Sequence, residues 1–179
     1  LSTPGLASML SSFQKRLDGL LQWLLITLMV VLTVVVMVAV FYRRFGNSLI
    51  WYDEVASVLM AWITYYGASL AALRRRHIGF DGLLLRLPLG LRLAAAAIAE
   101  IAVIGFFVLL AWAGVRVLQV VGDEYLISLP WVSVVVTQSV IPISAVLFVV
   151  CELLSLPAYW QSVREGHSLE HPEFEVERS

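Results

Sequence analysis

The sequence predicts an all-α membrane protein with four transmembrane helices, an N-terminal amphipathic interfacial helix and two cytoplasmic termini. Of the 179 residues, 60% are hydrophobic and 14% are charged, whereas soluble domains contain about 25% charged residues. Each apolar stretch is long enough to cross a bilayer as a helix and lacks the alternation of a barrel strand. Within a transmembrane domain at residues 20–156, the predicted spans are residues 20–42, 55–73, 93–121 and 132–156.

The N-terminal segment, residues 1–19, is expected to lie on the membrane surface. Its apolar residues recur at helical spacing, and its polar residues fall on the rest of the helical wheel. We therefore predict an amphipathic helix in the interface, after which the chain turns into the membrane. A frayed tail with a chance pattern is the alternative. The pattern runs over residues 6–21, where the apolar side consists of Leu6, Met9, Leu10, Phe13, Leu17, Leu20 and Leu21.

The second span has opposite charges at its two ends. Trp51, Asp53 and Glu54 precede it, and Arg74, Arg75 and Arg76 follow it. Aromatic rings favour the membrane interface, and a helix dipole favours acids at its N-terminus and bases at its C-terminus. We expect the arginines to face phospholipid headgroups or a partner.

One face of the second span carries small residues, which let another helix approach closely. We expect this face to make a helix–helix contact, either within the chain or with a partner. Its residues lie three or four positions apart and are widened by Gly67: they are Ser57, Ala61, Thr64, Ala68 and Ala72.

The basic residues predict the orientation of the chain. With four crossings, the two termini and the loop after the second span share one side. Of the 12 Lys and Arg residues, nine lie on the side of the termini. The other three, Arg43, Arg44 and Arg116, lie on the opposite side. Basic residues accumulate on the cytoplasmic side, so both termini are predicted to be cytoplasmic. We expect Arg43 or Arg44 to pair with Glu54.

Few side chains are candidates for a metal site or an ion path. His77 and Asp81 are four residues apart, but a metal site would need a further ligand and none is near. We expect both to fix the turn of the middle loop. Glu100 lies about 12 Å into the third span at helical rise. We favour structural pairing of Glu100 over an ion path, because a path needs several polar residues at mid-membrane.

The fourth span and the tail complete the prediction. Pro142 lies near the centre of the span and is expected to kink it. Residues 157–179 form a polar cytoplasmic tail, which we expect to be disordered from Arg164 onward. The sequence contains no nucleophile motif, so no enzymatic activity is predicted.

A series of short motifs runs in order through residues 15–160. In order and spacing the series resembles the small membrane subunit (DctQ-like) of TRAP transporters, the tripartite ATP-independent periplasmic uptake systems. Gly79-Phe80 departs from the family, which often has a basic or β-branched residue there. The motifs are Arg44-Phe45-Gly46 with Leu49, Trp51, Asp53-Glu54 with Ala56, Trp62, Gly67-Ala68, His77-Ile78, Asp81, Leu87-Pro88, Leu129-Pro130 and Ile141-Pro142.

The resemblance implies a three-part uptake system in the bacterial inner membrane. A periplasmic solute-binding protein captures a solute that typically bears a carboxylate, and a large membrane subunit moves it by means of a sodium gradient. The small subunit packs against the large one and helps to dock the binding protein. Sodium is expected to bind the large subunit, so no cofactor is expected on this chain, and no nucleic acid is expected as a partner.

Three alternatives remain at this stage. A self-sufficient small transporter or channel would move solute or ions without a partner. A membrane enzyme would use His77 and Asp81. The small subunit of another tripartite carboxylate transporter would also have four helices, although the pattern from Trp51 to Asp81 argues against it.

Overall fold

A computed structural model describes residues 4–47, 49–74 and 88–165 of the chain. Their helices are α1 (Pro4–Arg44), α2 (Tyr52–Leu73), α4 (Leu89–Val120), α5 (Val134–Gln138) and α6 (Val140–Glu165). Within the described residues, four stretches are long and apolar enough to cross a membrane. They are α1 from Met9, α2, α4, and α5 together with α6. The predicted all-α fold with four potential spans is confirmed.

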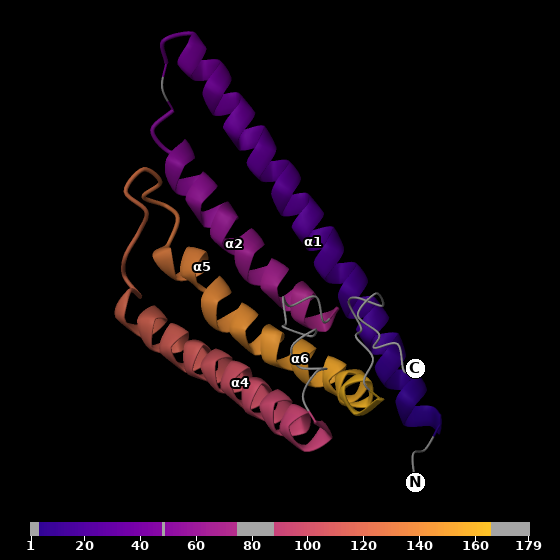
Figure 1. Ribbon diagram of the computed structural model, residues 1–179. Helices are drawn as coiled ribbons and strands as arrows, with labels where there is room; N and C mark the ends of the chain where they lie inside the picture. Colours follow the sequence, from indigo (N-terminus) through magenta and orange to yellow (C-terminus); the bar gives the residue numbers. More distant parts are fainter. Residues whose placement is uncertain (1–3, 48, 75–87, 166–179) are drawn as a thin grey trace.

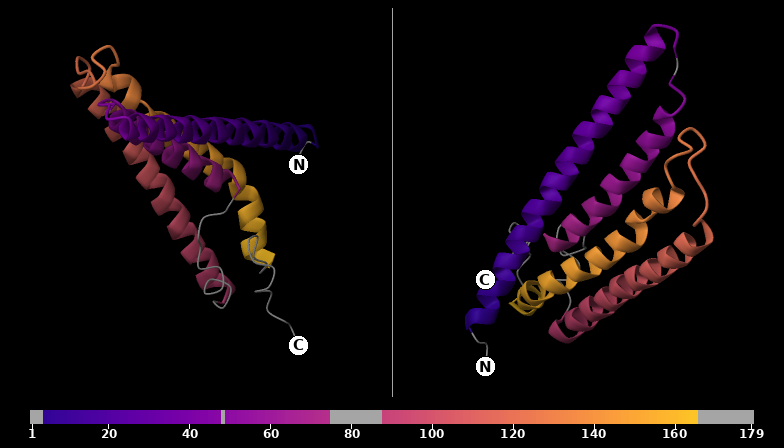
Figure 2. Two further views of the ribbon diagram at one scale, coloured as in Figure 1. Left: turned by 90° about the horizontal axis from the view of Figure 1, so that it is seen from above. Right: turned by 180° about the vertical axis from the view of Figure 1, so that it is seen from behind.

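The four spans lie side by side in a single row (Figure 1). The order across the row is α1, α2, α6 and α4, and each helix packs mainly against its neighbours. The row is twisted, because α4 points in a direction different from that of α1 (Figure 2). Among the described residues, a single row leaves two broad faces uncovered. We name its two ends the Trp51 end and the Arg74 end, after the residues that flank α2.

Helix α1 joins the predicted interfacial helix to the first span without a break. It contains 41 residues, which corresponds to about 60 Å at helical rise. The turn expected near residue 20 is therefore absent, and this part of the prediction was wrong. The physical reason lies at the junction, where Leu21 is fully buried in the core and Leu17 packs against it. Both side chains keep this part of the chain helical against α2 and α6.

The core lies where α2, α4 and α6 pack together, with Leu21 entering from α1. Phe148 of α6 is 1% exposed, and its ring stacks on Phe107 of α4 with centroids 3.5 Å apart. The Ser69 hydroxyl donates a hydrogen bond to the Ser144 carbonyl, which links α2 to α6. Between helices in lipid, van der Waals packing and hydrogen bonds replace the hydrophobic effect as the source of stability.

Helices α4 and α6 approach each other closely at Gly114 of α4. A Cβ atom at this position would lie 2.9 Å from Cδ and 3.1 Å from the backbone nitrogen of Pro142 in α6. Only glycine leaves room for this contact. No local sequence pattern marks Gly114, because its partner lies in another span.

Pro142 breaks the fourth span near its start, so the predicted kink near the centre was wrong. The break lies at Ser139, between the end of α5 and the start of α6. Proline has no amide hydrogen, and therefore it cannot satisfy the carbonyl four residues earlier, that of Gln138. Pro157 is the proline that lies inside α6.

Helix α6 also extends beyond the predicted end of the span. Residues 157–165 are helical, and Ser162 and Val163 are buried. This part of the predicted polar tail is therefore packed secondary structure. The rest of the tail, residues 166–179, lies outside the described residues.

Candidate interaction surfaces

At the Arg74 end, an ion pair ties α1 to α2. The Arg74 guanidinium donates from Nε and Nη2 to the two carboxylate oxygens of Asp18, at 2.5 and 2.8 Å. This hydrogen-bonded carboxylate holds the pKa of Arg74 above its usual value. Arg74 was predicted to face lipid or a partner, and its contact with Asp18 was not anticipated. Arg75, Arg76, His77 and Asp81 lie outside the described residues.

Replacing Asp18 with asparagine should weaken the contact between α1 and α2. The two side chains are about one-third exposed, so we expect a coupling energy of about 0.5–1 kcal/mol. A double-mutant cycle of Asp18→Asn with Arg74→Gln, followed by thermal unfolding in detergent, measures it. Additive effects of the two substitutions would show that the pair does not contribute to stability.

At the Trp51 end, Glu54 holds the loop that joins α4 to α5. Its Oε2 atom accepts a hydrogen bond from the backbone amide of Ser128 at 3.0 Å. In the part of the chain that the structure describes, no ion pair joins Glu54 to Arg43 or Arg44, so the expected pair is not formed. Both arginines lie in the last turn of α1, where the helix dipole favours positive charge.

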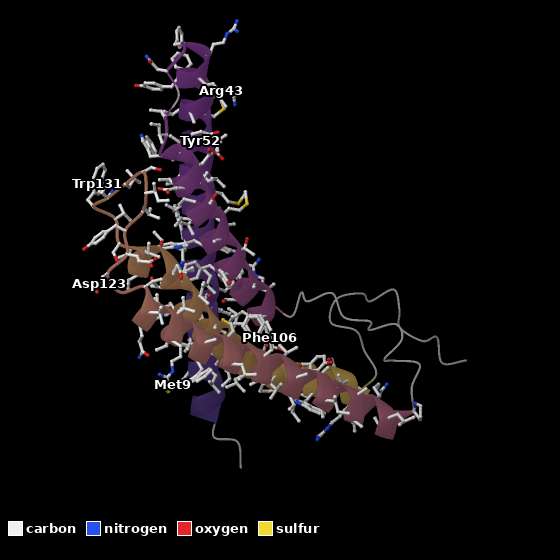
Figure 3. The ribbon with its side chains drawn as sticks, turned by 90° about the vertical axis from the view of Figure 1, so that its left-hand side faces the viewer. Met9, Arg43, Tyr52, Phe106, Asp123 and Trp131 are labelled. Atoms are coloured by element: carbon white, nitrogen blue, oxygen red, sulfur yellow. The ribbon has the colours of Figure 1, made fainter. Side chains whose placement is uncertain are left out.

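The loop after α4 reaches the start of α2. Figure 3 shows Asp123 and Trp131 on this loop, on the same side as the Tyr52 end of α2. Pro130 lies in its turn, which is closed by a hydrogen bond from the Val132 amide to the Leu129 carbonyl at 2.9 Å. Trp131 is 77% exposed. The loop therefore presents an exposed aromatic ring at this end, and it also carries the exposed acids Asp123 and Glu124.

Trp62 connects α2 to the break in the fourth span. Its indole N–H donates a hydrogen bond to the Thr137 carbonyl at 2.9 Å. Thr137 lies in the last turn of α5, where carbonyls lose their regular helical partners. Trp62 therefore stabilises the break that Pro142 imposes.

Replacing Trp62 with phenylalanine removes this hydrogen bond but keeps an aromatic ring. We expect a loss of about 1–2 kcal/mol in stability, because the carbonyl is left without its donor in an apolar setting. Thermal unfolding in detergent measures the loss. Replacing Trp112 of α4, which is 61% exposed, with phenylalanine is the control and should have little effect. Equal effects of the two substitutions would contradict this role.

The small-residue face of α2 is divided between two uses. Ala72 is buried and Ala68 packs against the core, while a Cβ atom on Gly67 would contact Leu25 of α1 at 4.0 Å. The residues closer to the Trp51 end, Ser57 and Thr64, are exposed. The expected helix–helix contact is therefore made within the chain in one half and left open in the other.

The open half borders a groove of about 800 Å³ between α2 and the α5–α6 break. We call it the α2–α5 groove. On α2 it is lined by Asp53, Glu54, Ser57, Val58, Ala61 and Tyr65, and the facing wall includes Thr137, Gln138 and Ile141. Glu124, from the loop, also lines it. The walls of the groove thus combine small, apolar and polar side chains, and carboxylates lie near one end.

Glu100 does not belong to this groove. It is 8% exposed and belongs, with Ala96 and Gly114, to the buried residues of α4. Because α4 packs against α6, the carboxyl lies within the helix row. Among the described residues, no group of three or more His, Cys, Asp or Glu side chains could hold a metal ion.

Residues 32–161 match the model of a protein family described as "Tripartite ATP-independent periplasmic transporters, DctQ component". The chain belongs to the DctQ family. A search of curated proteins found no match. The matched region contains α2, α4 and α5 entirely, most of α6 and the last part of α1.

As a DctQ component, the chain is a small membrane component of a TRAP transporter, and the family consists of transporter parts, not of enzymes. Its partners in the tripartite system are the large membrane subunit and a solute-binding protein. Together with the four apolar spans, membership makes it a multi-pass protein of the inner membrane. The row of helices is therefore the form in which this component meets its partners.

Proposed function

We propose that the chain is the small permease subunit that supports the large membrane subunit of a sodium-driven TRAP transporter. In this role it also helps to dock the periplasmic binding protein during uptake of a carboxylate-type solute. The observation that carries the proposal is the single row of helices in a DctQ protein, because both faces of a row are available for contact. Sodium binds the large subunit in this scheme, and phospholipids cover what the partners leave open.

The proposed orientation places the Trp51 end in the periplasm and both termini in the cytoplasm. The distribution of the basic residues supports it, since nine of the 12 lie on the proposed cytoplasmic side. The exposed Trp131 and the acids of the same loop would then face the binding protein. Residues 9–19 of α1 would lie at the cytoplasmic interface, where Met9 and Phe13, both more than half exposed, can enter the bilayer.

Reconstitution tests the proposal. The chain and its large subunit should co-purify, and uptake of a carboxylate solute into liposomes should require both, the binding protein and an inward sodium gradient. Solute movement by this chain alone, or uptake that does not respond to sodium, would contradict it.

Glu100 provides a test against the self-sufficient carrier. If its carboxyl has a structural role, Glu100→Gln should leave sodium-driven uptake by the assembled complex within about twofold of the wild type, because the amide keeps the size of the side chain and one acceptor oxygen. The measurement is the initial uptake rate at matched complex concentration. Loss of uptake in a complex that still assembles would point to an ion path through α4.

A further inference from the structure

We propose that the α2–α5 groove receives a transmembrane helix of the large subunit, which brings a basic residue to the Asp53 end of the groove. This inference rests on the proposed function, and it assigns the contact with the large subunit to one surface of the chain. It leaves the rest of the row to lipid or to other contacts.

The dimensions of the groove fit a helix. From Asp53 to Tyr65 the groove follows α2 for about 18 Å at helical rise, or roughly three turns. Along this length the side chains that α2 presents include Ser57 and Ala61, which allow two helix backbones to approach closely. Both belong to the small-residue face, and Ser57 is among its exposed members.

The polarity of the groove favours a protein helix over an acyl chain. Gln138 lines the wall, and its amide makes no side-chain hydrogen bond to any residue that the structure describes. The depth of Gln138 follows from its neighbour Thr137, whose carbonyl accepts a hydrogen bond from Trp62. Trp62 lies nine residues after Asp53, or about 13 Å further along α2. At such a depth an amide lacks water, and a hydrogen bond to a neighbouring helix stabilises it whereas a hydrocarbon chain cannot.

The charge at the end of the groove defines the partner further. Asp53 and Glu124 are exposed and line the groove, and Glu54 is already bonded to Ser128. The Tyr52 hydroxyl is hydrogen-bonded to the Asp53 carboxylate. Two exposed carboxylates at one end of the groove favour Lys or Arg on the incoming helix. The hydroxyls of Ser57 and Thr64 differ from these carboxylates, because they already donate hydrogen bonds to backbone carbonyls of α2 itself.

Site-specific photocrosslinking in membranes that contain both subunits tests the proposal. We expect benzoylphenylalanine at Ser57 to form an adduct with the large subunit. The control position is Ile101 of α4, which is 72% exposed and does not line the groove. An adduct of Ser57 with lipid alone, or with a second copy of the chain, would overturn the proposal.

Charge reversal provides an independent test with a matched control. Glu124→Lys should lower recovery of the large subunit about tenfold, which corresponds to roughly 1.4 kcal/mol. Asp123→Lys makes the same change on the adjacent exposed residue, which does not line the groove, and should not lower recovery. Equal loss in both variants, or loss in neither, would contradict the groove as the contact.

The outcomes separate this inference from the proposed function. If the wild-type chain does not co-purify with the large subunit, the proposed function itself fails. If the wild-type complex forms but Ser57 yields no adduct with the large subunit, only the assignment of the groove fails. Thermal unfolding of the Glu124→Lys chain on its own should match the wild type, which excludes misfolding as the cause of lost recovery.

Discussion

Replacing Gly114 with alanine should destabilise the chain, although alanine is the better helix former. The new methyl group would lie within 3.1 Å of the backbone nitrogen of Pro142, so α4 and α6 must move apart. Overpacking of this kind costs about 1–3 kcal/mol, which exceeds the gain of about 1 kcal/mol from helix propensity. Thermal unfolding of the purified chain in detergent measures the effect.

Gly105 is the matched control for this substitution. It lies on the same helix, and a Cβ atom there would have no neighbour within 4 Å. Gly105→Ala should therefore leave stability unchanged or raise it by up to about 1 kcal/mol. If both glycines responded alike, the close approach of α4 to α6 at Gly114 would be disproved.

Replacing Phe148 with alanine should destabilise the chain even more than the alanine substitution of Gly114. The ring is 1% exposed and stacked on Phe107, so its removal leaves a cavity in the middle of the row. Such truncations cost about 3–5 kcal/mol in water-soluble proteins, and the lost packing persists in lipid because cavity formation does not depend on transfer from water. We expect the chain to lose its cooperative unfolding transition.

Cys151 reports this change without any added probe. It is the only cysteine of the chain, and it is fully buried in the same cluster as Phe148. Its rate of labelling by a small thiol reagent in detergent should rise strongly in Phe148→Ala. The control is Phe106→Ala, which removes the same type of ring from a 60% exposed position of α4, and should leave the labelling rate near that of the wild type. Slow labelling in both variants would contradict the stacked pair as a core element.

The two halves of the small-residue face of α2 differ in what they contact. Towards the Arg74 end, small residues such as Ala72 pack against α1 and α6. Towards the Trp51 end, Ser57 and Ala61 border the α2–α5 groove instead. The chain can thus remain folded through one half of α2 while the other half stays open as a groove.

Pro142 correctly indicated a break in the fourth span, but the sequence placed the break at the wrong position. Pro142 predicted an irregularity, and one exists, but it lies between α5 and α6 and not in the middle of a helix. The predicted span began at residue 132, whereas helical structure begins at Val134 and continues to Glu165. A hydropathy pattern ends where polar residues begin, but a helix ends where its backbone hydrogen bonds end, and the two limits differ in this span.

The sequence by itself determined the helical class, the four spans and the charge difference between the two sides. These properties are local, because about 20 apolar residues must satisfy their backbone groups within one helix to cross a bilayer. It also determined the order of motifs from Arg44 to Pro142 that indicated the DctQ family, which the family match confirmed.

Only the tertiary structure decided the order of the helices in the row, the continuity of α1 and the contacts that hold the row together. Asp18 and Arg74 are separated by 56 residues, and Gly114 meets Pro142 across two different spans. No local pattern shows which small residue will face a proline or which acid will meet an arginine. Those choices follow from the way whole helix surfaces pack, and the same packing decided which half of the α2 face was closed and which half was left as a groove.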